Sequence, residues 1–200
     1  MGRLLLCVPS FDGTVKARTA EAIGNMDTSG CDVTQLHVGG YSVARARNIM
    51  AQAALDGAYD HLLMVDSDMV PPPDALQLLL SHGVDVCMGW AVRGTSDEGR
   101  TSAIRLHTRN FEASYYANEL SFRAEQGEPL MQVKGNGMAF ALVRTSVFAR
   151  LQRPWFKYVD YPDGSALGED YYFCQQCNTA GIQLHVDARV HCGHIHDRVL

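Results

Sequence analysis

Short apolar segments alternate with segments of helical spacing along the first ninety residues. A continuous apolar run of about four to eight residues is typical of a buried strand, whereas apolar residues three and four positions apart indicate a helix. The apolar segments predict strands at residues 4–8, 32–38, 61–65 and 84–88. The segments between them predict helices at residues 14–26, 42–55 and 71–80. This alternation predicts a doubly wound α/β fold with a parallel sheet and helices on both of its faces.

Residues with special backbone preferences support the helix boundaries. Thr14 and Ser42 are predicted N-caps, because a hydroxyl oxygen accepts a hydrogen bond from an unpaired backbone N–H at a helix start. Gly57 is expected to stop the second helix, since glycine is common just after a helix ends. Pro71 opens the third predicted helix, where proline suits the first turn.

The pattern is weaker after residue 90. A polar stretch at 93–100 and a stretch rich in Gly, Pro and Asp at 160–168 predict loops. Further strands are predicted at residues 102–107, 131–134, 138–143 and 182–186, and helices near Thr145 and at 169–179. We therefore expect a single compact domain over residues 1–200, with two halves at 1–90 and 91–200.

Composition narrows the class of protein. Of the 200 residues, 46% are hydrophobic and 20% are charged, which is enough apolar material for a core and argues against disorder. The net charge of -5 disfavours a broadly basic surface for nucleic acid or membranes. No apolar run approaches the roughly 18 residues of a membrane span, and the N-terminus has no signal-peptide cleavage pattern. The six cysteines lie in or beside apolar segments, so we expect free thiols and a cytoplasmic location.

Two carboxylates follow the buried strand predicted at 61–65. In parallel sheets, ligands bind beyond the carboxyl ends of the strands, which is where Asp66 and Asp68 fall. Two carboxylates one residue apart can hold a hard divalent cation together with phosphate oxygens. The alternative is a polar turn that caps the next helix.

Two further groups of polar residues open predicted helices. Arg45, Arg47 and Asn48 either form a solvated helix face or recognise a nucleotide, because a guanidinium can clamp a phosphate and an amide can read a base edge. Glu169 and Asp170 either complement the helix dipole or supply a general base. Asp170 is the first candidate for that base, and Glu169 is a candidate to bind the acceptor.

Three other features have competing interpretations. The run of His and Cys at 191–196 either completes a metal site with Asp68, forms a structural zinc site with Cys174 and Cys177, or is an unstructured tail. Trp90 is either a core residue or stacks on a sugar or base. The glycines at 135–137 either form a hairpin turn or leave room for a sugar.

These segments, in this order, resemble the GT-A-type nucleotide-sugar glycosyltransferases, particularly the large family-2-like group. The resemblance extends from Leu4 to about His194. Its carriers are Val8-Pro9-Ser10, Ala44 to Asn48, Leu63 to Pro71, Gly135 to Phe140, Gly168 to Phe173 and Cys192-Gly193-His194. It implies a GT-A-like, Rossmann-like mixed sheet, with a nucleotide-binding half at 1–90 and an acceptor-side half at 91–200.

The resemblance also implies roles for individual residues. A nucleoside pocket would be lined by Pro9, Ser10 and Phe11. Arg45 and Asn48 would contact the base or diphosphate. Asp66 would face the ribose or a metal-bound water. Ser67 and Trp90 would also bind the donor. Manganese or magnesium would be held by Asp68 and His194, with Asp66 nearby, and Asp170 would activate the acceptor hydroxyl.

The activity implied is metal-dependent transfer of a sugar from a nucleotide-diphosphate sugar, with UDP favoured, to an acceptor hydroxyl. An inverting route is favoured over a retaining one. The acceptor is a saccharide, a small molecule or a hydroxymethylated base in DNA, for which Arg93, Arg100, Arg105 and Arg109 offer a local basic strip. Acceptor selectivity is expected from 91–130, from 160–168 or from oligomerisation.

Two alternatives belong to other classes. A nucleotidyltransferase would use a similar sheet, nucleotide and metal, but usually carries a Gly-rich basic loop after its first strand. The corresponding stretch here, Ser10 to Lys16, has few glycines. A non-catalytic sugar- or zinc-binding module is the other alternative.

Overall fold

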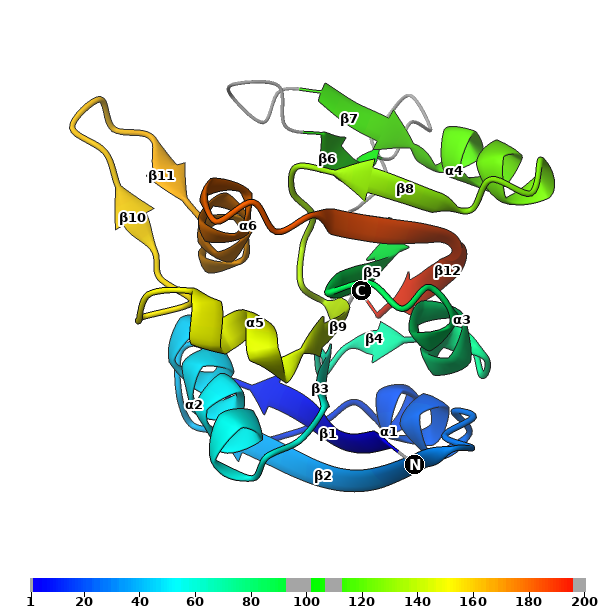
Figure 1. Cartoon of the computed structure of the whole chain (residues 1–200), viewed down its shortest axis with the longest axis horizontal. Coiled ribbons are helices and arrows are strands. Elements are labelled where there is room, and N and C mark those ends of the chain that lie inside the picture. The colour runs from blue at the N-terminus through cyan, green and yellow to red at the C-terminus, as the bar shows by residue number, and fades with distance from the viewer. Residues whose placement is uncertain (1, 93–101, 107–112, 196–200) are drawn as a thin grey trace, which may run out of the picture.

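An eight-stranded mixed sheet forms the centre of the molecule (Figure 1). The structure is a computed structural model that describes residues 2–92, 102–106 and 113–195. The strand order is β2-β1-β3-β9-β5-β12-β4, and β8 also pairs with β12. The strands of this sheet are β1 (Gly2–Ser10), β2 (Cys31–Gly39), β3 (His61–Val65), β4 (Met69–Val70), β5 (Val86–Ala91), β8 (Leu130–Val133), β9 (Phe140–Arg144) and β12 (Leu184–His194).

The strands of the sheet run in two opposite directions. Strands β1, β2 and β3 pair in parallel, and β5 pairs in parallel with β12. Strand β9 lies between β3 and β5 and is antiparallel to both. The strands predicted in the first ninety residues therefore run in one direction, but β3 and β5 are separated by a later strand. The predicted α/β fold with a mixed sheet is confirmed.

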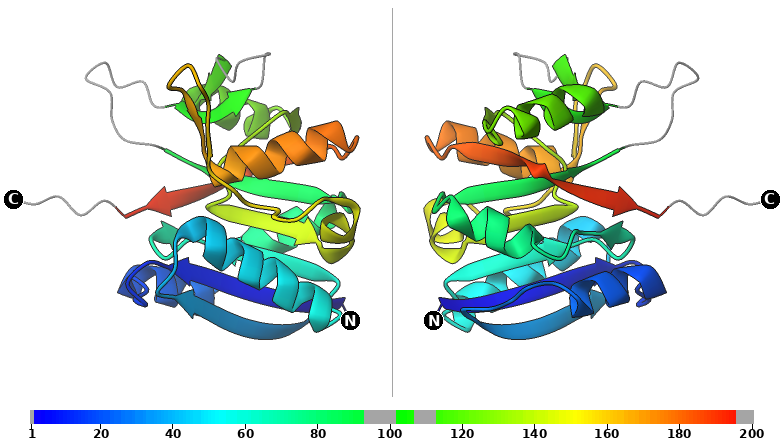
Figure 2. Two further views of the ribbon diagram at one scale, coloured as in Figure 1. Left: turned by 90° about the vertical axis from the view of Figure 1, so that its left-hand side faces the viewer. Right: turned by 90° about the vertical axis from the view of Figure 1, so that its right-hand side faces the viewer.

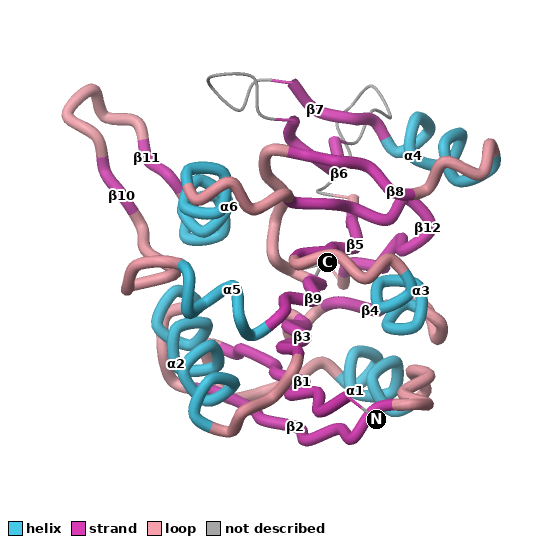
Figure 3. The backbone as a smooth tube through the Cα atoms, in the orientation of Figure 1, coloured by secondary structure: helices cyan, strands magenta, loops and turns pink. Residues whose placement is uncertain are grey.

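Helices cover both faces of this sheet (Figures 1, 2 and 3). The helices are α1 (Ala17–Gly24), α2 (Val43–Asp56), α3 (Ala75–Ser81), α4 (Ala117–Glu125), α5 (Thr145–Arg150) and α6 (Glu169–Thr179). Helices α2, α5 and α6 pack on one face, and α1 and α3 pack on the other. None of the described helices is long and apolar enough to cross a bilayer.

Alternating side chains of the central strands enter two separate cores. Leu5 and Cys7 of β1 belong to the core under α2, whereas Leu4 and Leu6 belong to the core under α1 and α3. Successive side chains of a strand point to opposite faces, so a strand covered on both sides must be apolar at every position. This is why β1 and β3 read as continuous apolar runs.

Two of the four predicted helix boundaries are confirmed. Ser42 accepts a hydrogen bond from the Arg45 backbone N–H at 3.5 Å, and Gly57 is the C-cap of α2, as predicted. Thr14 is not a cap, because α1 begins at Ala17. Its backbone N–H and hydroxyl donate to Asp12 Oδ1 at 2.9 and 2.7 Å instead.

The third helix is shorter than predicted. Helix α3 begins at Ala75, after the three prolines at 71–73. A residue that precedes proline is restricted to extended conformations. Consecutive prolines therefore delay the helix until the last of them has passed.

The C-terminal strand is longer than predicted. Strand β12 continues to His194, with a register shift between Val186 and His191. Its end pairs with β4, so Gly193 lies opposite Val70 and His194 opposite Met69. The alternative of an unstructured tail is therefore wrong for 191–194.

Two hairpins lie outside the main sheet. One pairs β6 (Ser102–Leu106) with β7 (Ala113–Tyr116), and the other pairs β10 (Val159–Asp160) with β11 (Ala166–Leu167). The second occupies the segment predicted as a loop at 160–168. The predicted loop at 93–100 lies outside the described residues, as do Arg93, Arg100 and Arg109 of the suggested basic strip.

Candidate active site

A buried arginine joins three segments that are distant in the sequence. Arg47 of α2 is only 2% exposed. Its Nη2 donates to both carboxylate oxygens of Asp66, at 2.9 and 3.1 Å, and its Nη1 donates to Glu169 Oε1 at 2.5 Å. Asp66 follows β3 and Glu169 opens α6. We call these three residues the Arg47 cluster.

Arg47 attracts both carboxylates of the cluster, although burial still raises the pKa of Asp66 on balance. Burial lowers the pKa of Arg47, but the carboxylates of Asp66 and Glu169 raise it by a larger amount. The pKa of Arg47 is therefore raised on balance. The guanidinium therefore stays charged. Charge-assisted and bidentate hydrogen bonds of this kind are among the strongest in proteins and hold both carboxylates in defined orientations.

Tyr158 lies at the surface close to the Arg47 cluster. It is 53% exposed and precedes β10, whose Val159 pairs with Leu167, two residues before Glu169. Partial burial and the nearby negative charge of Glu169 raise the pKa of Tyr158, so the phenol remains protonated. Glu169 therefore has a buried cation on one side and an exposed aromatic ring nearby.

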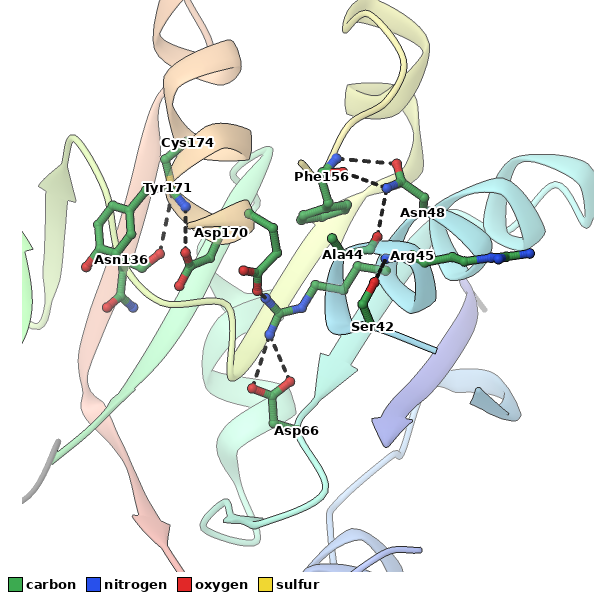
Figure 4. A network of polar contacts seen from close by, with 12 residues as sticks. Ser42, Ala44, Arg45, Asn48, Asp66, Asn136, Phe156, Asp170, Tyr171 and Cys174 are labelled. Atoms are coloured by element: carbon green, nitrogen blue, oxygen red, sulfur yellow. Dashed lines mark hydrogen bonds and ion pairs between the residues drawn. The ribbon is translucent and has the colours of Figure 1, made fainter. Parts of the chain in front are cut away.

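Asp170 lies beside the Arg47 cluster but has a different environment. Its Oδ1 accepts a hydrogen bond from the Tyr171 backbone N–H at 2.8 Å (Figure 4). Within the part of the chain that the structure describes, no cation forms an ion pair with it. Burial and the neighbouring Glu169 charge raise the pKa of Asp170. A carboxylate with a raised pKa is a stronger base than an ordinary one, as a general base requires.

Gly168 leaves the space that the Asp170 carboxylate occupies, and Gly137 lies in ordinary contact with it. A Cβ atom on Gly168 would lie 2.7 Å from Asp170 Oδ1, and one on Gly137 would lie 3.7 Å from Oδ2. Any side chain at position 168 would therefore displace the carboxylate. The glycine turn noted in the sequence at 135–137 approaches Asp170 in this way, with Gly137 nearest.

Asp68 and His194 form a second polar pair at the same edge of the sheet. His194 Nε2 lies 3.2 Å from Asp68 Oδ2, and both side chains are partly exposed. The pairing of β4 with β12 brings them together, and Ile195 N–H donates to the Asp68 carbonyl at 2.9 Å. The residues predicted to share a metal are therefore neighbours.

The donor set allows a test of whether a metal would fit. In the described residues, no group of three or more His, Cys, Asp and Glu side chains could hold a metal ion. Asp66 faces Arg47 rather than this pair. Asp68 and His194 fit a cation that takes its remaining ligands from phosphate and water, which is the usual arrangement for magnesium beside substrate phosphates.

The other residues predicted to bind the donor lie at the ends of β1 and β3. Ser10 ends β1 and is buried, whereas Phe11 is 79% exposed beyond it. Pro9 is also buried in β1. The Ser67 carbonyl accepts from Lys16 N–H at 3.0 Å, which joins the loop after β1 to the one after β3. These residues share the strand edge where Asp66 lies.

Arg45 and Asn48 do not lie in the Arg47 cluster. The Arg45 guanidinium stacks over the Tyr41 ring at 4.5 Å, and it extends away from Asp66 and Asp170 (Figure 4). The Asn48 amide donates to the Phe156 carbonyl at 2.7 Å and accepts from Trp155 N–H at 2.9 Å. Asn48 therefore fastens the segment before β10 to α2.

Trp90 and the two cysteines of α6 are core residues. Trp90 is buried, its Nε1 donates to the Ala188 carbonyl at 2.9 Å, and its ring stacks on His191 at 3.9 Å. Burial raises the pKa of Cys174 to about 12, so its thiol is neutral, and Sγ donates to the Asn136 carbonyl at 3.6 Å. Cys177 is also buried and free. The described residues thus form no zinc site around these cysteines.

One available sequence signal identifies Arg47 as special. It falls on the spacing of Met50, Ala51 and Ala54, all of which are buried. An arginine in register with the apolar face of a helix must find carboxylate partners inside the protein. Tyr158, in contrast, stands in no pattern that reveals its position near Glu169.

Comparison with known proteins identifies the fold. No protein-family model and no curated protein matches the chain. Three solved structures each align with 98% of it. They are A197 from STIV (21% identity, TM-score 0.64, 86% of that chain), GalNAc-T7 with UDP, GalNAc and Mn2+ (12%, 0.63, 44%) and S. aureus TarS 1-349 in complex with UDP-GlcNAc (12%, 0.54, 60%). The chain spans less than two thirds of the length of the GalNAc-T7 and TarS chains. It therefore has a GT-A-like fold, similar to that of solved nucleotide-sugar glycosyltransferases.

Proposed function

We propose that this protein is a glycosyltransferase that moves a sugar from a nucleotide-diphosphate sugar to an acceptor hydroxyl. The observation that carries the proposal is the position of Asp170. It is a carboxylate of raised pKa, placed at the edge of the sheet that also holds Asp66 and Asp68. Two structures with similar folds contain UDP or UDP-GlcNAc, so a UDP-sugar is the favoured donor.

The donor would bind along the carboxyl ends of β1 and β3. Pro9, Ser10 and Phe11 would line the nucleoside, and the loop of Asp66 and Ser67 would face the ribose. Asp68 and His194 would hold manganese or magnesium beside the diphosphate. When bound, that cation supplies a Lewis acid for the charge of the departing diphosphate.

The chain's own residues account for the proton. Asp170 takes the proton of the acceptor hydroxyl as the acceptor oxygen bonds to the anomeric carbon of the donor sugar. The bond from that carbon to the diphosphate oxygen breaks, and its electron pair leaves with the nucleoside diphosphate. The products are an inverted glycoside, the nucleoside diphosphate and a protonated Asp170 that returns its proton to water. A retaining route would not need Asp170 as base.

The Arg47 cluster would hold the two sides of the site in register. Asp66 belongs to the donor side, and Glu169 precedes the base on the acceptor side. Arg47 bonds both, so it would act as a positioning residue. Fixed polar groups of this kind reduce the reorganisation needed during reaction.

A panel of nucleotide sugars with Mn2+ tests the proposal. A ligand that binds only the folded state raises the melting temperature, so the preferred donor should give the largest shift. Hydrolysis of that donor to a nucleoside diphosphate should follow. Absence of any shift across UDP-, GDP-, ADP- and dTDP-sugars would contradict the proposal, and release of pyrophosphate would identify a nucleotidyltransferase instead.

A further inference from the structure

The β10–β11 hairpin projects from the body of the molecule beside α6 (Figures 1 and 2). Its tip is closed by hydrogen bonds. Tyr161 N–H donates to the Ser165 carbonyl at 2.9 Å, and Gly164 N–H donates to the Tyr161 carbonyl at 3.0 Å. Asp163 Oδ1 accepts from both the N–H and the hydroxyl of Ser165. The hairpin is thus an ordered arm and not an open loop.

Two aromatic rings are exposed on this arm. Tyr158 precedes β10 and is 53% exposed, and Tyr161 follows it and is 39% exposed. Exposure of an apolar aromatic face to water is unfavourable, and a bound partner removes that cost. Tyrosine is common at binding surfaces because it offers a large rigid face with a polar end. The arm therefore carries the features of a binding surface.

Tyr158 lies next to the segment that carries the proposed base. Val159 pairs with Leu167, so Tyr158 lies beside the backbone of Gly168, which directly precedes Glu169 and Asp170. Glu169 bonds Arg47, so the start of α6 beside this ring is fixed.

Charge indicates which ligands the arm would accept. Asp160 and Asp163 are exposed on it and Asp170 follows it, whereas Glu169 is buried against Arg47. Of the described cations in the segment before the arm, Lys157 lies 6.0 Å from the Tyr172 ring and Arg153 stacks over Trp155. A surface with this excess of carboxylates repels polyanions such as DNA. It suits a neutral molecule whose hydroxyl groups can donate to carboxylates.

We propose that Tyr158 is an acceptor-binding residue, whose exposed ring stacks on a sugar ring of an uncharged saccharide. A sugar ring has an apolar C–H face and a rim of hydroxyls, which match an aromatic face flanked by carboxylates. Stacked there, the saccharide presents a hydroxyl to Asp170. The inference rests on the proposed function, because it assigns the acceptor of that same reaction.

Saturation-transfer NMR with defined probes tests this inference. The probes are the methyl α- and β-glycosides of glucose, galactose, mannose, N-acetylglucosamine and N-acetylgalactosamine, each with the protein, UDP and Mg2+. We expect at least one to bind, and Tyr158→Ala to weaken its binding about tenfold, which corresponds to about 1.4 kcal/mol. Tyr158→Leu, which keeps the bulk but not the ring, should weaken it similarly.

Matched variants separate stacking from other effects. Tyr158→Phe keeps the ring and loses only the hydroxyl, so its binding should stay within about threefold of wild type. Phe122→Ala removes an exposed ring of α4, 60% exposed, and should change nothing. UDP affinity should be equal in all variants.

The outcomes that overturn the inference differ from those that overturn the proposed function. If UDP binds but no glycoside does, or if Tyr158→Ala and Tyr158→Leu bind glycosides as well as wild type, Tyr158 is not an acceptor residue. Tyr158-dependent binding of a hydroxymethylcytosine oligonucleotide, in place of glycosides, would also overturn it. If UDP itself fails to bind wild type, the proposed function fails first.

Discussion

Arg47 donates two hydrogen bonds from one nitrogen to the carboxylate of Asp66, at 2.9 and 3.1 Å, from a position that is almost completely buried. Its other terminal nitrogen reaches α6. The same guanidinium therefore fixes the end of β3 and the start of the helix that carries Asp170. The stability of the domain and the geometry of the proposed site depend on one side chain.

Arg47→Ala should destabilise the protein strongly. It leaves two carboxylates without their cation, and removal of one partner from a buried ion pair costs about 3–5 kcal/mol. Urea denaturation measures the change. Arg45→Ala is the matched control, since that arginine is exposed over Tyr41 and should cost at most about 1 kcal/mol. Equal losses in both variants would contradict the role given to Arg47.

Asp170→Asn should abolish sugar transfer and spare donor binding. Loss of a general base typically reduces the rate by about a hundred- to ten-thousand-fold, whereas the amide keeps the shape of the side chain. Rates of nucleoside diphosphate release and melting shifts with donor report the two effects separately. Asp32→Asn, at an exposed position of β2, serves as control. A fully active Asp170→Asn would favour a retaining route.

The pH profile of transfer should show an acidic limb set by Asp170. Because the pKa of this carboxyl is raised above its ordinary value of 3.8, the base becomes protonated, and activity falls, at a pH above that value. The limb should appear in kcat/KM for the wild type and vanish from the residual activity of Asp170→Asn. A limb that is unchanged in the variant would assign it to another group.

Asp68→Ala and His194→Ala should each weaken binding of Mn2+ in the presence of UDP. Loss of one of two protein ligands is expected to cost at least about tenfold in metal affinity. Electron paramagnetic resonance counts free Mn2+ without requiring activity. His37→Ala, an exposed histidine of β2, is the control. Unchanged affinity in both variants would exclude this pair as the metal site.

Asp187, a buried carboxylate outside the Arg47 cluster, should make the free energy of unfolding depend on pH in the acidic range. Asp187 is fully buried and bonds Arg189 at 2.6 Å and His82 at 2.7 Å. Burial raises the pKa of Asp187, but these hydrogen bonds lower it more, so its net pKa is below 3.8. The stabilisation it provides is therefore complete well above pH 4 and is lost as the pH falls through the lower folded value.

Asp187→Asn tests this pH dependence. At pH 7 it should lower the free energy of unfolding by about 2–3 kcal/mol, because hydrogen bonds to a charged group are lost. The difference from wild type should shrink as the pH falls below 4. A difference of constant size between pH 7 and pH 3 would show that ionisation of Asp187 does not contribute.

The sequence by itself determined most of the local structure. Strand β3 and helix α6 have the predicted bounds, because a strand covered on both faces is apolar throughout and a helix ends where glycine follows. Asp66, Asp68 and Asp170 were identified because each follows or opens such an element. These signals depend only on neighbours in the chain.

The tertiary structure decided what those residues contact. The insertion of β9 between β3 and β5, and the pairing of β12 with β4 that brings His194 to Asp68, depend on hydrogen bonds between segments far apart in sequence. The apolar pattern of a strand indicates that both of its faces are buried, but it does not indicate which strands pair with it. Likewise, the apolar spacing of α2 marks Arg47 and not Arg45 as buried, but only the packing of α2 on the sheet decides that its partners are Asp66 and Glu169.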